Sequence, residues 1–206
     1  NKMITAMRKI FAFPLLFSLL FVLSFDVNAQ RRTEEIDPYR EFLNELSEYR
    51  KLCRNALKPY RYDGAKTTHF SYKDYNYRKE VEIGTVQDSE YRLSFNSNGI
   101  KYDQIKVEIY DKPSKFKARV LLYEKDGIGG NEFTVETGPM LDKLKEVKRE
   151  KGVEEEIIER MRLKKLYISY VIPAIDREIE VDPETGNEVK VVTKGAIVLA
   201  IGYSNI

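Results

Sequence analysis

The sequence predicts a mainly β protein: an antiparallel β-sandwich of about eight to ten strands with an N-terminal amphipathic helix and a short charged helical insertion. After residue 60, short runs of alternating apolar and polar residues are separated by turn signals every eight to twelve residues or so. That rhythm is typical of an antiparallel sandwich or barrel rather than a parallel sheet. Before residue 60 the apolar spacing is helical, and residues 140–165 are dense in charged side chains.

The first 29 residues form a separate segment, which we expect to be a signal peptide. Basic residues are followed by an apolar run and then by short side chains, the order that signal peptidase recognises: Lys2, Arg8 and Lys9, then Ile10 to Phe25, then Val27-Asn28-Ala29. The run is shorter than the ~20 residues that span a bilayer comfortably, so an uncleaved anchor is the second interpretation. We expect an exported chain that begins at Gln30, resides in the periplasm or outer envelope, and has no membrane span after cleavage.

Composition limits the classes of partner. Residues 1–29 contain three basic residues and one acidic residue, so the 35 basic and 33 acidic residues of the chain leave equal numbers once this segment is removed. Balanced and interspersed charge argues against a nucleic-acid partner, which needs a concentrated basic face. The remaining length matches one ordinary domain with a core of its own.

Residues 30–59 are expected to be an amphipathic helix that packs on the sandwich of residues 60–206. Asp37-Pro38 is a favourable helix start, and Pro59 ends the helix. Apolar residues recur at three- and four-residue spacing along one face: Tyr39, Phe42, Leu43, Leu46, Tyr49, Cys53, Ala56 and Leu57. Cys53 lies within this stripe, which favours a buried structural cysteine over a reactive or bridging thiol.

The strands are expected at runs of period two. The clearest alternating segments are Thr68–Tyr72, Val81–Ile83, Tyr91–Phe95, Ile105–Ile109 and Phe133–Val135. Further strands are expected at Val120–Tyr123 and at Leu166–Ile172, which is apolar on both faces. Ile179–Val181 and Val189–Val192 flank a turn and predict a hairpin. Ala196–Gly202 is apolar on both faces, which predicts a central strand with the helix over its outer side. The insertion at 140–165 is expected to hold two short helices interrupted near Gly152.

Candidate chemistry is sparse, and we expect no catalytic residue, metal or cofactor. His69, the only histidine, lies in a strand-like run without a nucleophile signature, which favours a solvated or edge-strand residue. One histidine and one cysteine do not fill a structural zinc site. The turns Asp126–Glu132 and Asp182–Glu188 carry acidic and amide oxygens, but hairpin turn chemistry explains them without calcium. A carboxylate-pair hydrolase ranks last among the alternatives.

Aromatic residues are concentrated between residues 60 and 77, where we place the candidate binding residues Tyr72, Tyr75 and Tyr77. The full set is Tyr60, Tyr62, Phe70, Tyr72, Tyr75 and Tyr77. Tyrosine offers a flat apolar ring with a polar tip, which suits glycan stacking and protein contacts. The alternative is an ordinary sheet surface, because tyrosine also favours strands.

Two stretches carry a resemblance to known proteins. The Ala29-Gln30 junction and the closing segment Lys194–Tyr203 resemble small exported proteins of the Bacteroidota that are uncharacterised. The strands Tyr91–Phe95 and Val107–Tyr110, together with that last strand, are similar to jelly-roll sandwiches of the pre-peptidase C-terminal type. This second resemblance covers residues 60–206, while the charged insertion departs from it. It implies an accessory or binding role and carries over no catalytic residue.

These observations favour a non-catalytic binding or assembly module of the cell envelope that acts through protein contacts. A glycan-binding module is the alternative, with Tyr72, Tyr75 and Tyr77 as a stacking platform. The expected partner is therefore an envelope protein or a glycan.

Overall fold

The computed structural model describes residues 38–86, 89–100, 104–176 and 179–205. The chain divides into two compact units, Asn1–Arg40 and Glu41–Ile206. The whole sandwich belongs to the second unit. The expected signal peptide at residues 1–29 lies outside the described residues and stays a prediction.

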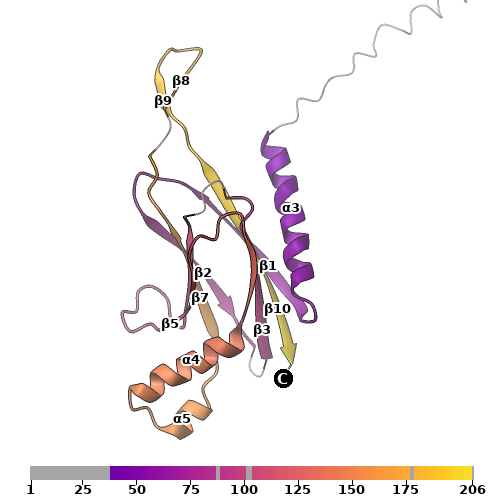
Figure 1. The fold of residues 1–206 in the computed structure, drawn as a ribbon, viewed down its shortest axis with the longest axis vertical. Helices are drawn as coiled ribbons and strands as arrows, with labels where there is room; N and C mark the ends of the chain where they lie inside the picture. Colours follow the sequence, from indigo (N-terminus) through magenta and orange to yellow (C-terminus); the bar gives the residue numbers. More distant parts are fainter. Residues whose placement is uncertain (1–37, 87–88, 101–103, 177–178, 206) are drawn as a thin grey trace, which may run out of the picture. The chain divides into compact units, whose positions relative to one another are not determined.

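Eight strands form two four-stranded antiparallel sheets, which confirms the predicted β-sandwich (Figure 1). The first sheet has the order β1 (Arg61–Ser71), β10 (Lys194–Asn205), β3 (Ser89–Asn96) and β6 (Glu132–Glu136). The second has the order β2 (Tyr77–Gly84), β7 (Lys165–Ile172), β4 (Lys106–Tyr110) and β5 (Leu121–Lys125). The chain repeatedly crosses between the sheets, and this strand order is that of a jelly roll.

The core lies between the two sheets and is filled by alternate side chains of each strand. Phe95 of β3 stacks on Phe133 of β6 with ring centroids 4.8 Å apart. Tyr170 of β7 approaches Phe95 from the opposite sheet, edge to face at 6.5 Å. These rings lie within one continuous cluster of buried residues that draws on both sheets. Aromatic packing therefore joins the two layers.

Strand β10 lies in the centre of its sheet and is buried on both faces, as its sequence predicts. One face contributes Ile197, Leu199 and Ile201 to the core. The other presents Ala196, Val198 and Ala200 to Leu46, Cys53 and Leu57, which come from α3 (Pro38–Ala56) and the turn after it. The small alanines allow the helix to approach the sheet closely.

The helix begins and ends inside the predicted range of 30–59. It starts at Pro38, the favoured first helical position, and residues 30–37 lie outside the described part of the chain. Cys53 is buried, as predicted, with its Sγ 3.7 Å from the Val198 carbonyl oxygen. Burial away from water raises the pKa of the thiol to about 11.

The charged insertion forms two helices, α4 (Thr137–Glu150) and α5 (Glu155–Glu159), which confirms the prediction. Gly152 stands in the turn between them with a φ of 74°, a conformation that favours glycine. Arg149 and Glu155 form an ion pair across this turn at 2.7 Å. Met140 and Leu144 are the buried apolar residues of α4.

The predicted hairpin is present as β8 (Ile179–Val181) and β9 (Glu188–Lys190), a separate two-stranded sheet. It projects from one end of the sandwich, and α4 and α5 lie at the opposite end (Figure 1). The turn is closed by Asp182, whose Oδ1 accepts the amide of Glu184 at 2.8 Å. This local bond accounts for the acidic residue in the turn.

Candidate functional site

The outward face of the second sheet carries mostly charged and polar side chains, and we call it the polar face. It is built by the side chains of β2, β4 and β7 that point away from the core, and strand pairing places them in rows. Its members are Arg78, Glu80, Glu82, Lys106, Glu108, Tyr110, Lys165, Tyr167 and Ser169. Residues 30 and more positions apart in the sequence become neighbours here.

Glu108 lies at the centre of the polar face and is almost fully buried, with 7% of its surface exposed. Its carboxylate accepts hydrogen bonds from the Arg78 guanidinium and, at 2.8 Å, from the Tyr110 hydroxyl. Lys106 Nζ lies 3.5 Å away. Desolvation raises the pKa of Glu108, but the bonds from Arg78 and Tyr110 and the nearby cations outweigh it and hold the pKa below its usual range. The group is therefore an ionised, oriented carboxylate.

Glu108→Gln is expected to lower the free energy of unfolding at pH 7 by about 1.5–3 kcal/mol, the range for hydrogen bonds to charged groups. The pKa of Glu108 is lower in the folded state than in the unfolded state. Its ionised carboxylate therefore stabilises the fold at pH values above the unfolded-state pKa of about 4.3. That stabilisation is lost as pH falls through the folded pKa. Urea unfolding should therefore show that the variant and the wild type differ in free energy of unfolding at pH 7, and that this difference is smaller in acid.

Glu124→Gln is the matched control, because Glu124 also pairs with Lys106, at 2.7 Å, but is half exposed. We expect it to change stability by under about 1 kcal/mol. Equal losses for Glu108→Gln at both pH values would contradict the role assigned to the Glu108 charge.

The loop between β4 and β5 folds over one end of the polar face. The Ser114 amide donates to the Glu80 carboxylate at 3.1 Å, and the Arg119 guanidinium stacks 3.6 Å from the centroid of the Tyr110 ring. Between loop and sheet lies a hollow of about 540 Å³, which we call the loop hollow. It is lined by Glu80, Glu82, Pro113, Ser114, Lys115, Phe116, Lys165 and Tyr167.

The predicted tyrosine platform is only partly brought together. Tyr72 is buried at 2% exposure and packs edge to face on Phe70 at 5.3 Å, so its inclusion in a surface platform was wrong. Tyr72 follows Phe70 at a spacing of two, which directs both side chains to the core face. Tyr75 and Tyr77 do form a pair, with centroids 6.1 Å apart. Lys73 Nζ lies 4.9 Å and 4.8 Å from their centroids.

A second hollow of about 610 Å³ adjoins this pair at the other end of the polar face. It is lined by Asn76, Tyr77, Arg78, Gln104, Lys106, Val171 and Pro173. Tyr75 is 53% exposed, whereas the Tyr77 hydroxyl donates to the Ser71 carbonyl at 2.5 Å and its ring is partly buried. Of the three predicted tyrosines, Tyr75 offers the most ring surface to a ligand.

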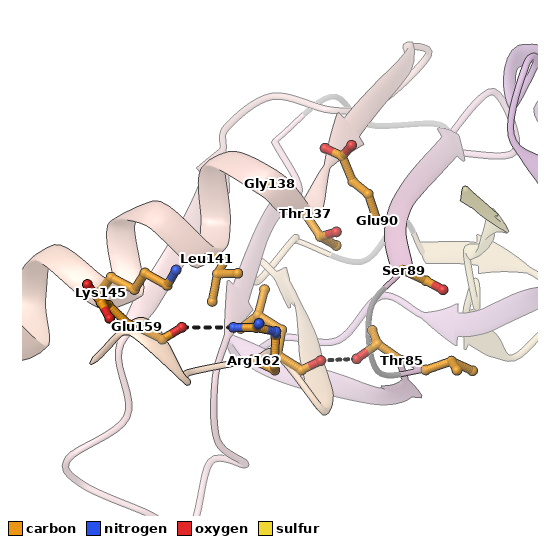
Figure 2. A pocket seen from close by; sticks show the side chains of 11 residues that line it. Thr85, Ser89, Glu90, Thr137, Gly138, Leu141, Lys145, Glu159 and Arg162 are labelled. Carbon is orange, nitrogen blue, oxygen red and sulfur yellow. Dashed lines mark hydrogen bonds between the residues drawn. The ribbon is translucent and has the colours of Figure 1, made fainter. Parts of the chain in front are cut away.

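A cavity of about 640 Å³ lies where the helical insertion meets the sandwich (Figure 2). Lys145, Glu159 and Arg162 line it from the insertion side, opposite Thr85 and Glu90. Its polar groups serve local structure: the Thr85 hydroxyl donates to the Leu163 carbonyl, and Arg162 donates to the Glu159 carbonyl at 2.9 Å. The first contact holds the segment that follows α5 against the end of β2, and the second joins this segment to the end of α5.

The remaining candidates occupy the positions that the sequence predicts. His69 is exposed on β1, which is an edge strand, and its ring lies 6.4 Å from that of Phe42. In the turn after β5, the Asn131 amide donates to the carbonyls of Gly127 and Gly129. Across the described parts of the chain, no three residues among His, Cys, Asp and Glu gather in a way that would hold a metal ion.

The fold and its surfaces define a jelly-roll β-sandwich with one helix-covered sheet and one polar sheet face. Comparisons with protein-family models, with curated proteins and with solved structures find no match for this chain. Within the residues that the structure describes, every helix is too short or too polar to cross a bilayer. The resemblances to small exported proteins of the Bacteroidota and to pre-peptidase C-terminal sandwiches stay predictions.

Proposed function

We propose that the chain is an exported, non-catalytic binding or assembly module of the cell envelope that acts through protein contacts. The observation that supports this most directly is the β8–β9 hairpin. All six residues of its two strands are exposed. Val181 is the most exposed of its apolar residues, at 64%, and Ile179, Val189 and Val192 are also exposed. An isolated two-stranded hairpin is marginally stable in water, so a partner would stabilise it.

The hairpin offers two means of recognition. Within the described strands, β8 pairs only with β9, so the outer edge of each strand has backbone groups available for pairing with an added strand. Ile179 and Val181 share one face, while Val189 stands opposite Glu180 on the other. Acidic residues outnumber basic ones in the segment Ile179–Lys190, which favours a partner with a basic strand edge.

A tagged chain, crosslinked in its native envelope and purified, is expected to bring down one stoichiometric protein. The double variant Val181→Ser and Val189→Ser should lose it, because it removes an apolar side chain from each face of the hairpin. Ile157→Ser is the matched control, since Ile157 is similarly exposed but lies on α5 at the other end of the sandwich. The intact mass of the purified chain is expected to show the loss of residues 1–29.

Recovery of the same protein with equal yield from the hairpin variant would overturn this assignment. So would the absence of any protein above background in the wild-type sample. A yield lowered only by Ile157→Ser would move the interaction to the helical insertion.

Glycan binding is the second candidate function. It is favoured by the exposed ring of Tyr75, by its neighbour Tyr77, and by the adjoining hollow with amide and cationic side chains. Aromatic rings beside hydrogen-bonding groups suit sugars, which have apolar faces and polar edges. Retention on polysaccharides would distinguish this function from protein contacts.

A further inference from the structure

The loop hollow has an exposed apolar residue on an ordered loop. The Phe116 amide donates to the Pro113 carbonyl at 3.0 Å, and the Val120 amide donates to Asp111 Oδ1 at 2.6 Å. Two bonds from the Ser114 amide, at 3.1 and 3.2 Å, tie the same loop to Glu80. These bonds hold the loop backbone that carries Phe116, whose side chain is 47% exposed. Binding residues are often placed on loops held by a rigid scaffold.

The hollow combines two aromatic side chains from different elements. Phe116 belongs to the loop, and Tyr167 belongs to β7 on the floor of the polar face. Lys115 Nζ lies 5.4 Å from the Phe116 centroid, so a ligand would stack on the part of the ring that this ammonium leaves open. Flat apolar rings flanked by polar groups match the alternating apolar and hydroxylated surfaces of a sugar ring.

Both carboxylates of the hollow are already in ion pairs, while Lys115 lies against the Phe116 ring. Lys165 Nζ lies 2.5 Å from the Glu82 carboxylate, and the Arg119 guanidinium lies 3.5 Å from the Glu80 carboxylate. Carboxylates held in this way are oriented acceptors for hydroxyl groups. The lining contains two carboxylates and two lysine ammonium groups, so it has no net charge. An acidic ligand would be repelled by both carboxylates and would meet only Lys115 outside these pairs, whereas a neutral polyhydroxylated ligand would add bonds to them.

We propose that the loop hollow binds a neutral sugar residue of an oligosaccharide. Phe116 and Tyr167 provide the stacking surfaces. Glu80 and Glu82 accept hydrogen bonds from ring hydroxyls. The volume of about 540 Å³ falls within the range of small-ligand pockets. The proposal rests on glycan binding, the second candidate function, and assigns it to a different site from the Tyr75–Tyr77 pair.

The test is titration calorimetry of the purified chain with neutral oligosaccharides of glucose, xylose, mannose and galactose, and with oligogalacturonate as a charged comparison. We expect saturable binding of at least one neutral oligosaccharide at about 1 mM or below. Phe116→Ala is expected to weaken it about tenfold or more, and Glu82→Gln to weaken it measurably. Both residues are on the surface, and circular dichroism checks that the variants fold. Tyr75→Ala tests the tyrosine pair as the alternative site. Tyr62→Ala is the matched control, since Tyr62 on β1 is 44% exposed, and it should bind as the wild type does.

The possible results distinguish a failure of the loop hollow as the site from a failure of glycan binding as the function. No saturable binding of any neutral oligosaccharide up to about 10 mM overturns the proposal and the glycan-binding function together. Binding that Tyr75→Ala abolishes and Phe116→Ala leaves unchanged overturns the loop hollow but keeps glycan binding at the tyrosine pair. Tighter binding of oligogalacturonate than of every neutral oligosaccharide overturns the choice of a neutral ligand.

Discussion

Phe95→Ala is expected to lower the free energy of unfolding by about 3–5 kcal/mol, the usual cost of removing a large buried aromatic side chain. Phe95 is 1% exposed and contacts both sheets through Phe133 and Tyr170. Its loss would leave a cavity that rigid strands on either side fill poorly. A domain of this size has about 5–15 kcal/mol of stability in total, so the variant should unfold at a much lower urea concentration.

Phe116→Ala is the matched control for this experiment. It removes the same side chain from the exposed loop between β4 and β5 and should change stability by no more than about 0.5 kcal/mol. A small effect of Phe95→Ala, comparable with that of Phe116→Ala, would contradict the two-layer aromatic core. The control also establishes that the loop variant is folded for the binding experiment.

Val198→Asp is expected to be at least as damaging, with a loss above about 4 kcal/mol, because it places an unpaired carboxylate in an apolar contact. Val198 is fully buried in the cluster that joins β10 to α3. The structure can relieve this cost by lifting the helix, which would expose Cys53. Two measurements therefore apply: urea unfolding, and the rate at which a thiol reagent labels Cys53.

In the wild type, labelling should be slow, because the Cys53 thiol is buried and its pKa is raised to about 11. The variant should react faster under native conditions. Val192→Asp is the control, since Val192 is 55% exposed beyond β9 and tolerates a charge. Unchanged stability together with slow labelling in Val198→Asp would show that α3 does not pack on β10.

The sequence predicts well those elements whose apolar residues recur at a regular spacing. The period-two runs predict the strands, because alternate side chains face opposite sides of a sheet. A strand without a polar side must be covered twice, which correctly predicts the central place of β10 and the helix over it. The hairpin turn at Asp182–Asn187 and the break between α4 and α5 at Gly152 follow from local backbone chemistry.

The candidate sites depend on pairing between distant segments, which local patterns do not record. Arg78 and Glu108 are 30 residues apart and meet only because β2 and β4 flank β7. The outward positions Lys106, Glu108 and Tyr110 carry a polar signal, but nothing local shows that Glu108 is buried. Composition grouped Tyr72 with the surface tyrosines. Its position two residues after Phe70 places it on the same side as Phe70, which faces the core.

The β class, the covering helix and the helical insertion follow from the sequence alone, because each depends on a repeating spacing or a turn residue. The jelly-roll strand order, the burial of Glu108 and the hollow beneath the Phe116 loop depend on tertiary packing. Burial and charge pairing are set by which strands become neighbours. Several strand orders satisfy the same alternation, and packing of the whole core selects one of them.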